Sequence, residues 1–176
     1  MTETEENVAT TPGDLPDPVA MAASLQAELM KRSAMVATAE SLTGGELGVL
    51  LSAAPGASET YLGGMVTYAT AVKQRVLGVS EETVRTHGVV SAQCAAEMAV
   101  GVRSLLGADY AISTTGVAGP TEQEGKPVGL VYLGVAGPDG VSTKELHLDG
   151  DRARVRKLSC LEAMSAAIAV LVDVDQ

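Results

Sequence analysis

The chain has 176 residues, which is long enough for one well-packed domain and short for two. Its 12 Lys and Arg against 22 Asp and Glu give a formal net charge of -10. This charge argues against a general affinity for nucleic acid or anionic membrane, since both bind cationic surfaces. Hydrophobic residues make up 46% of the sequence, without Phe or Trp, so aliphatic side chains must build the core.

The first half of the chain begins with a segment that differs from the rest. Residues 1–16 are polar and acidic, which is typical of a disordered leader before a single domain over residues 17–176. Asp17 followed by Pro18 predicts a helix start, because Asp is a favoured N-cap and Pro a favoured first helical residue. The further elements expected are a strand over 35–39, a helix ending at Pro55-Gly56, a strand over 60–68 and a helix over 70–78.

In the second half, Ser91 is expected to cap a helix that Gly107 ends. The remaining elements expected are strands over 110–114, 128–136 and 141–148, a glycine loop over 116–126, and a helix over 151–172. The turn sequence Gly-Pro-Asp-Gly between the last two strands predicts an antiparallel hairpin. Helices between the early strands imply parallel crossovers. We therefore expect an α/β fold, a three-layer α/β/α sandwich with a mixed, mostly parallel sheet of about five strands.

The sequence lacks the signals of a membrane span, a signal peptide and a metal site. No apolar run of about 18 residues suggests a membrane span, and the acidic N-terminus lacks the features of a signal peptide, so a cytoplasmic location is expected. Cys94 and Cys160 have no metal-type spacing, and His87 and His147 are isolated. We expect neither a metal nor a cofactor. The Ala- and Val-rich faces and the base rate for oligomers favour a homodimer or a higher homo-oligomer.

The first candidate for chemistry is the stretch TAESLTGG, where a strand is expected to run directly into a helix with Ser41 at the junction. A hydroxyl there lies beside the unpaired N–H groups of the first helical turn, which can stabilise an oxyanion after Ser41 attacks a carbonyl. Thr43, Gly44 and Gly45 are expected to contact the substrate, since the two glycines would let it approach the backbone. Taken alone, however, the junction favours simple helix capping by Ser41 or Thr43.

The second candidate is Tyr68 at a strand end with Lys73 in the first turns of a short helix. No Ser–His pair is obvious, but a Lys amine whose pKa is lowered can accept a proton from a serine nucleophile. Taken alone, a solvated Lys73 and a Tyr68 ring with an exposed hydroxyl are the favoured interpretation, since Lys is seldom buried.

The third and fourth candidates are a glycine loop and a basic helix start. Thr115-Gly116 begins TGVAGP at a strand end, where α/β proteins commonly bind ligands, although a plain glycine turn is equally compatible. Arg152 and Arg156 are one turn apart and can grip a phosphate or carboxylate together. A surface ion-pair cluster with Asp149 and Asp151 is the alternative for these cations.

Together these motifs resemble the CinA C-terminal-domain family, whose members include nicotinamide-nucleotide amidohydrolases. The matching blocks, across roughly residues 18–172, are TAESLTGG, VTYATAVKQRVLGV, HGVVSAQCAAEMA, TGVAGP, KPVGLVYLGV and GDRARVR. The resemblance implies an α/β/α sandwich that converts nicotinamide mononucleotide and water to nicotinic acid mononucleotide and ammonia, in pyridine nucleotide salvage. It assigns functional positions of the family to Ser41, Tyr68, Lys73, Thr115 and Arg152.

Two departures from the family pattern accompany this resemblance. Leu42 stands where many relatives have Cys or another small residue, and the loop over 121–125 reads TEQEG, without the glycine pair common there. The second departure leaves open how substrate fits beside that loop. Larger relatives carry a further N-terminal domain related to molybdopterin-binding proteins, and the short leader predicts that the activity of that domain is absent here.

The predicted reaction is acyl transfer from the carboxamide of nicotinamide. Ser41 attacks the carboxamide carbon, and either Lys73 or Tyr68 relayed to Lys73 accepts the proton. Amides of the turn over 41–45 hold the oxyanion, and water then hydrolyses the acyl-enzyme. Lys73 must be neutral part of the time, which a nearby Arg152 would favour.

Substrate binding is assigned to residues around this centre. Arg152, with Arg156 and the glycine loop that begins at Thr115-Gly116, is expected to bind the 5'-phosphate. Two other functions remain open. The domain can be a non-catalytic ligand-sensing or protein-binding module linked to competence or DNA damage response, or an amidase for another small amide.

Overall fold

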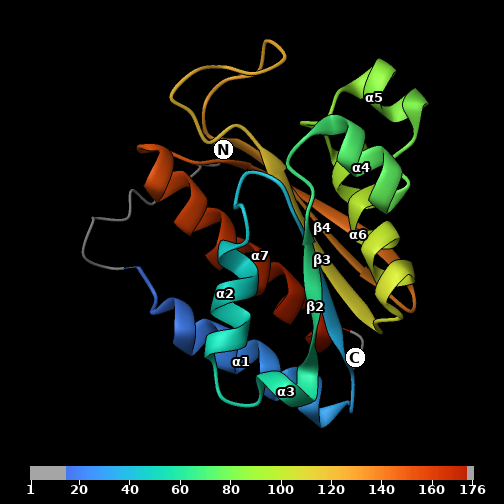
Figure 1. Cartoon of the computed structure of the whole chain (residues 1–176). Helices are drawn as coiled ribbons and strands as arrows, with labels where there is room; N and C mark the ends of the chain where they lie inside the picture. Colours follow the sequence, from blue (N-terminus) through green and yellow to red (C-terminus); the bar gives the residue numbers. More distant parts are fainter. Residues whose placement is uncertain (1–14, 174–176) are drawn as a thin grey trace, which may run out of the picture.

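The computed structural model describes residues 15–173, so the predicted leader over 1–16 lies almost entirely outside the described residues. The elements in chain order are α1 Pro18–Lys31, β1 Val36–Glu40, α2 Glu46–Ala53, α3 Ala57–Thr60, β2 Tyr61–Val66, α4 Thr70–Leu77, α5 Glu81–His87, α6 Ala92–Leu106, β3 Tyr110–Gly116, β4 Leu130–Gly137, β5 Gly140–His147 and α7 Arg152–Asp173. Figure 1 shows their arrangement. Within the described residues, no helix is long and apolar enough to cross a membrane.

The five strands form one mixed sheet in the order β2-β1-β3-β4-β5. β1 pairs in parallel with both β2 and β3. β4 runs antiparallel to β3, and β5 runs antiparallel to β4, so β5 points in the same direction as β3. Only β4 is reversed among these strands, which confirms the predicted mixed, mostly parallel sheet and the predicted hairpin.

Helices cover both faces of the sheet and complete the predicted three-layer sandwich (Figure 1). α1, α2 and α7 pack against one face, and α6 with α4 packs against the other. Neighbouring strand residues point to opposite layers, as Val36 joins the first core and Ala37 the second. Both cores consist almost wholly of aliphatic side chains and Met, because the sequence has no Phe or Trp.

The predicted helix starts depend on identifiable caps. The Asp17 carboxylate accepts a hydrogen bond from the Val19 amide, and the Ser91 hydroxyl accepts one from the Cys94 amide. Both confirm the predicted N-caps. The short helices α3 and α5 were not predicted. For α5 a signal was present, because Ser80 caps the helix and two Glu follow it in the first turn.

Candidate active site

The candidate site lies where the parallel strands end. At this edge Glu40, the last residue of β1, is in register with Thr114 of β3. The backbone continues the ladder one step further, because the Ser41 amide donates to the Thr114 carbonyl at 3.0 Å. The Thr67 amide, just past β2, donates to the Glu40 carbonyl at 2.8 Å. The carboxyl ends of three adjacent strands thus surround Ser41, where open α/β sheets bind ligands.

Ser41 and Lys73, which are 32 positions apart, meet in this structure. The Lys73 Nζ lies 2.9 Å from the Ser41 Oγ. The same nitrogen donates to the carbonyl oxygens of Thr67 at 2.8 Å and Tyr68 at 3.0 Å. α4 begins three residues before Lys73 and directs this side chain beneath the strand ends, where it is only 1% exposed. Lys73 is therefore a buried group that contacts the serine, rather than a solvated surface charge.

Burial lowers the pKa of Lys73, because removing the ammonium from water disfavours its charged form. The nearby Cys94 and Glu124 oppose this shift. A nearby Arg152 was expected to favour this shift, but burial is the leading cause, and the Arg152 guanidinium donates to the Gly119 carbonyl instead. In the neutral state Lys73 has two N–H donors and one lone pair. The two carbonyl acceptors match these donors, which leaves the lone pair for the Ser41 hydroxyl.

The turn between β1 and α2 differs from the predicted direct junction. α2 begins only at Glu46, with Gly45 as N-cap in the left-handed region (φ 101°) and no side-chain cap. Helix capping by Ser41 or Thr43 is therefore wrong. The Ser41 hydroxyl bonds to Lys73, and the Thr43 hydroxyl bonds to that of Thr114 at 2.8 Å.

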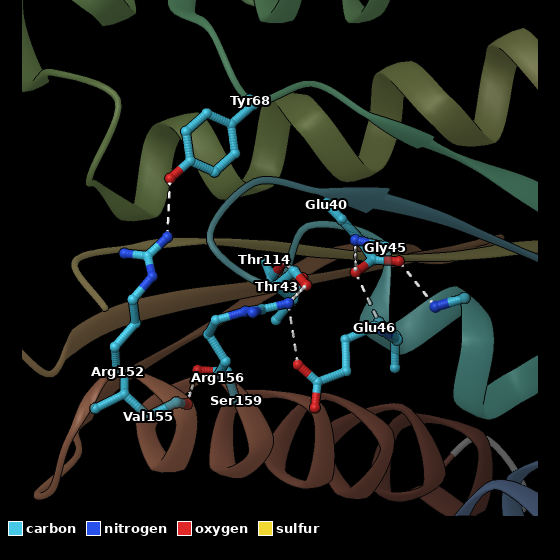
Figure 2. A network of polar contacts seen from close by, with 12 residues as sticks. Glu40, Thr43, Gly45, Glu46, Tyr68, Thr114, Arg152, Val155, Arg156 and Ser159 are labelled. Carbon is cyan, nitrogen blue, oxygen red and sulfur yellow. Dashed lines mark hydrogen bonds and ion pairs between the residues drawn. The ribbon is translucent and has the colours of Figure 1, made fainter. Parts of the chain in front are cut away.

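The Glu40 side chain binds the N-terminus of α2. Its carboxylate, 2% exposed, accepts hydrogen bonds from the amides of Gly45 at 2.9 Å, Leu47 at 3.1 Å and Gly48 at 2.8 Å (Figure 2). The Leu47 and Gly48 amides of the first turn of α2, where an oxyanion was expected to bind, are thus already paired with a carboxylate. Sequence analysis assigned Glu40 no role, although acids are favoured at helix N-termini.

Two amides of the turn remain without a partner among the described residues. The Gly44 amide donates to the Ser41 carbonyl, and the Glu46 amide to that of Thr43. Across residues 15–173, neither the Leu42 nor the Thr43 amide makes a hydrogen bond. These two N–H groups directly follow the serine, which is a position suited to an oxyanion.

Arg152, the first residue of α7, connects two sides of the site. Its guanidinium donates to the Gly119 carbonyl at 2.6 Å. It also donates to the Tyr68 hydroxyl at 3.1 Å (Figure 2). The Tyr68 side chain is 60% exposed, and its hydroxyl contacts Arg152 rather than Ser41 or Lys73. Tyr68 contacts Lys73 through its backbone carbonyl alone.

Arg156 and Thr115 lie next to the site without facing its cavity. Arg156 donates to the Thr43 carbonyl at 2.8 Å and pairs with Glu46 at 3.2 Å, so it fastens α7 to the turn (Figure 2). The Thr115 hydroxyl is buried and donates to the Val89 carbonyl at 2.6 Å. Arg152 and Arg156 therefore make these contacts in place of the alternative ion pairs with Asp149 and Asp151.

A cavity of about 350 Å³ opens beside the serine. It is lined by Ser41, Leu42, Tyr68, Gly116, Val117, Ala118, Gly119, Thr121, Glu122, Gln123 and Arg152. Of the predicted substrate-binding residues, Gly116 and Arg152 line it, whereas Thr43, Gly44, Gly45, Thr115 and Arg156 do not. A larger cavity of about 430 Å³ lies at the β4–β5 turn, but no predicted site residue lines it. Within the described residues, no three His, Cys, Asp or Glu side chains gather as metal ligands.

Fold and site together define an α/β/α sandwich protein with a buried serine–lysine pair at the carboxyl edge of its sheet. The chain belongs to the CinA C-terminal domain family, whose model matches residues 19–171. Its relatives include a CinA-like protein of Frankia casuarinae, 52% identical over 136 residues, which cover 77% of this chain and 31% of that protein. A CinA-like protein of Synechococcus elongatus is 45% identical over 147 residues, 82% of this chain and 35% of that protein.

The chain spans about a third of the length of these curated relatives. Solved structures match it over nearly their whole length. A competence-damaged protein (CinA) superfamily protein from Klebsiella pneumoniae has a TM-score of 0.87 and 33% identity, covering 90% of this chain and 99% of that one. The competence/damage inducible protein CihA from Agrobacterium tumefaciens has a TM-score of 0.83 and 35% identity, covering 89% and 98%.

Proposed function

We propose that this protein is an amidohydrolase that converts nicotinamide mononucleotide and water to nicotinic acid mononucleotide and ammonia. The observation that carries the proposal is the 2.9 Å contact between the Ser41 hydroxyl and the buried Lys73 amine, beside a cavity. A serine becomes a nucleophile when an adjacent base takes its proton. The resemblance to nicotinamide-nucleotide amidohydrolases supplies the substrate.

The proton path favours Lys73 over Tyr68 as the base. The lone pair of a neutral Lys73 faces the Ser41 hydroxyl, whereas the Tyr68 hydroxyl faces Arg152. In the first step the Ser41 oxygen bonds to the carboxamide carbon, and its proton passes to Lys73. Lys73 then gives a proton to the departing nitrogen, and ammonia leaves. Water attacks the resulting ester by the same route and releases the carboxylic acid and the serine.

Negative charge develops on the carboxamide oxygen during both attacks. The amides of Leu42 and Thr43 are the donors for this oxygen, because the other amides of the turn serve Ser41, Thr43 and Glu40. A missing oxyanion donor costs roughly 100- to 1,000-fold in rate where it has been measured by mutagenesis. Because a side-chain substitution cannot remove a backbone N–H group, stabilisation of the oxyanion depends on the conformation of the turn.

In this proposal Arg152 binds the 5'-phosphate of the substrate. It lines the cavity, and a guanidinium presents five donors, of which two are used by Gly119 and Tyr68. The others can bind phosphate oxygens. Arg152→Ala should raise KM with little change in kcat, if the phosphate is held equally in ground and transition states.

The test is to incubate the purified protein with nicotinamide mononucleotide and to measure both ammonia and the acid product. Ser41→Ala and Lys73→Met should each abolish release while the fold persists, as judged by circular dichroism. Ser52→Ala is the matched control for a lost serine hydroxyl, because Ser52 is exposed on α2 and bonds only to the Val49 carbonyl of its own helix. This control should keep full activity. Full activity of Ser41→Ala, or binding of the mononucleotide without turnover by the parent, would refute the proposal.

A further inference from the structure

We propose that Glu122 makes the site selective for a positively charged ring, so that the substrate is held and the product released by charge. This inference rests on the proposed function and deepens it. Glu122 lies in the TEQEG loop between β3 and β4, where the sequence departs from the family pattern. The resemblance implies no role for this residue, which lines the cavity in the structure.

The loop is fastened so that its tip reaches the cavity. The Glu124 carboxylate accepts hydrogen bonds from the amides of Val89 at 3.2 Å and Val90 at 3.3 Å. The Lys126 amine donates to the His87 carbonyl at 2.8 Å. Backbone bonds between Gln123 and Lys126 close the loop between these anchors. In Figure 1 this loop extends beyond the strand ends.

The cavity lining carries one acidic and one basic side chain. Glu122 and Arg152 are its only charged residues among those the structure describes. Arg152 uses two of its five donors on Gly119 and Tyr68, and the Glu122 carboxylate has no hydrogen bond or ion pair within residues 15–173. A ligand that suits this lining carries an anionic group for Arg152 and a cationic group for Glu122. A pyridinium nucleoside monophosphate is such a ligand.

The reaction changes the charge at the ring end of this ligand. The pyridinium ring of the substrate is positive and its carboxamide is neutral, so this end carries a net positive charge. Hydrolysis converts the carboxamide to a carboxylate, which cancels the ring charge. An acid at the cavity wall therefore attracts the substrate more than the product. Opposite charges 4 Å apart in water attract by about 1 kcal/mol, which corresponds to about fivefold in affinity.

The experiment compares three ligands that share the ribose phosphate. Nicotinamide mononucleotide has a positive ring end, whereas its dihydro form and nicotinic acid mononucleotide have neutral ring ends. Calorimetry in a Ser41→Ala background gives the Kd of each without turnover. Glu122→Gln should lower the ratio of either neutral-end Kd to the substrate Kd about fivefold. Glu122→Asp should keep most of the ratio, and Asp139→Asn at the far β4–β5 turn should leave it unchanged.

A structural defect and a charge effect give different results in this comparison. Distortion of the loop would weaken all three ligands together and leave their ratios constant, which would overturn the inference. If Glu122→Gln leaves the Kd ratios unchanged and the parent protein releases ammonia, the inference fails while the proposed function stands. If the parent releases no ammonia and none of the ligands binds, both fail. High salt should reduce the ratio in the parent and have little effect in Glu122→Gln.

Discussion

Glu40→Gln tests whether a buried carboxylate holds the turn that carries the serine. In the structure one Glu40 oxygen accepts from Gly45 and Leu47, and the other accepts from Gly48. Glutamine keeps the shape of the side chain but replaces one acceptor oxygen by an NH2 group. Whichever way the amide is turned, one or two helix amides then face a donor.

The expected loss of folding stability in Glu40→Gln follows from these hydrogen bonds. A hydrogen bond to a charged group is worth about 1.5–3 kcal/mol, and a buried donor left unpaired costs about 1–3 kcal/mol. Loss of a single bond, with the new side-chain NH2 group left unpaired, therefore predicts destabilisation of about 3 kcal/mol. For a domain of this size, each kcal/mol shifts Tm by about 2–4 °C, so Tm should fall by about 6–12 °C.

Thermal and urea unfolding, followed by circular dichroism, measure this change. Glu46→Gln is the matched control, because Glu46 also begins α2 but its side chain is partly exposed and pairs with Arg156 at the surface. Such a pair contributes at most about 1 kcal/mol. If Glu40→Gln proves as stable as Glu46→Gln, the carboxylate does not organise the turn that leaves the Leu42 and Thr43 amides without a partner in the described residues.

Three further predictions concern the base, the core and the thiols. The kcat for ammonia release should fall as pH drops through the lowered pKa of Lys73, since a protonated amine cannot accept a proton. As pH rises, kcat should reach its plateau before pH 10.5, the usual pKa of Lys, and a rise centred at 10.5 would contradict this. Gly134→Ala should destabilise the fold by about 1–3 kcal/mol in urea unfolding, because a Cβ there would lie 2.5 Å from the Ala95 carbonyl oxygen. Burial raises the pKa of Cys94 to about 11, so at about pH 8 its thiol should react with a disulfide reagent only after unfolding; rapid labelling of the native protein would count against the burial argument.

The resemblance to the family placed Ser41 and Lys73 in one site, and the sheet explains why they meet, because parallel strands place their carboxyl ends at one edge. β1 and β2 are adjacent and parallel, so the residues that follow them must come close together. The burial of Lys73 did not follow, because a short helix with few apolar residues is typical of the surface. The Thr67 and Tyr68 carbonyls that satisfy its amine are backbone groups, which a residue pattern does not reveal.

The sequence also did not show to which side of the sheet each polar residue of β3 points. Ser113, Thr114 and Thr115 are consecutive hydroxyl residues in a buried strand, and alternation sends them to opposite faces. Ser113 and Thr115 bond to carbonyls on the α6 side, whereas Thr114 bonds to Thr43 in the turn. Without the register of the strand, the sequence could not show that the predicted site residue Thr115 points toward the α6 side and away from the cavity.

The loop between β3 and β4 links the electrostatics of the base to those of the cavity. Glu124 raises the pKa of Lys73 against the effect of burial, and Glu122 lines the cavity two residues earlier. The serine–lysine pair itself comes from the turn after β1 and from α4, so a change in this loop leaves the reacting groups in place. Relatives that share the pair but differ over 121–125 are therefore expected to share the chemistry and to differ together in ligand charge preference and in working pH.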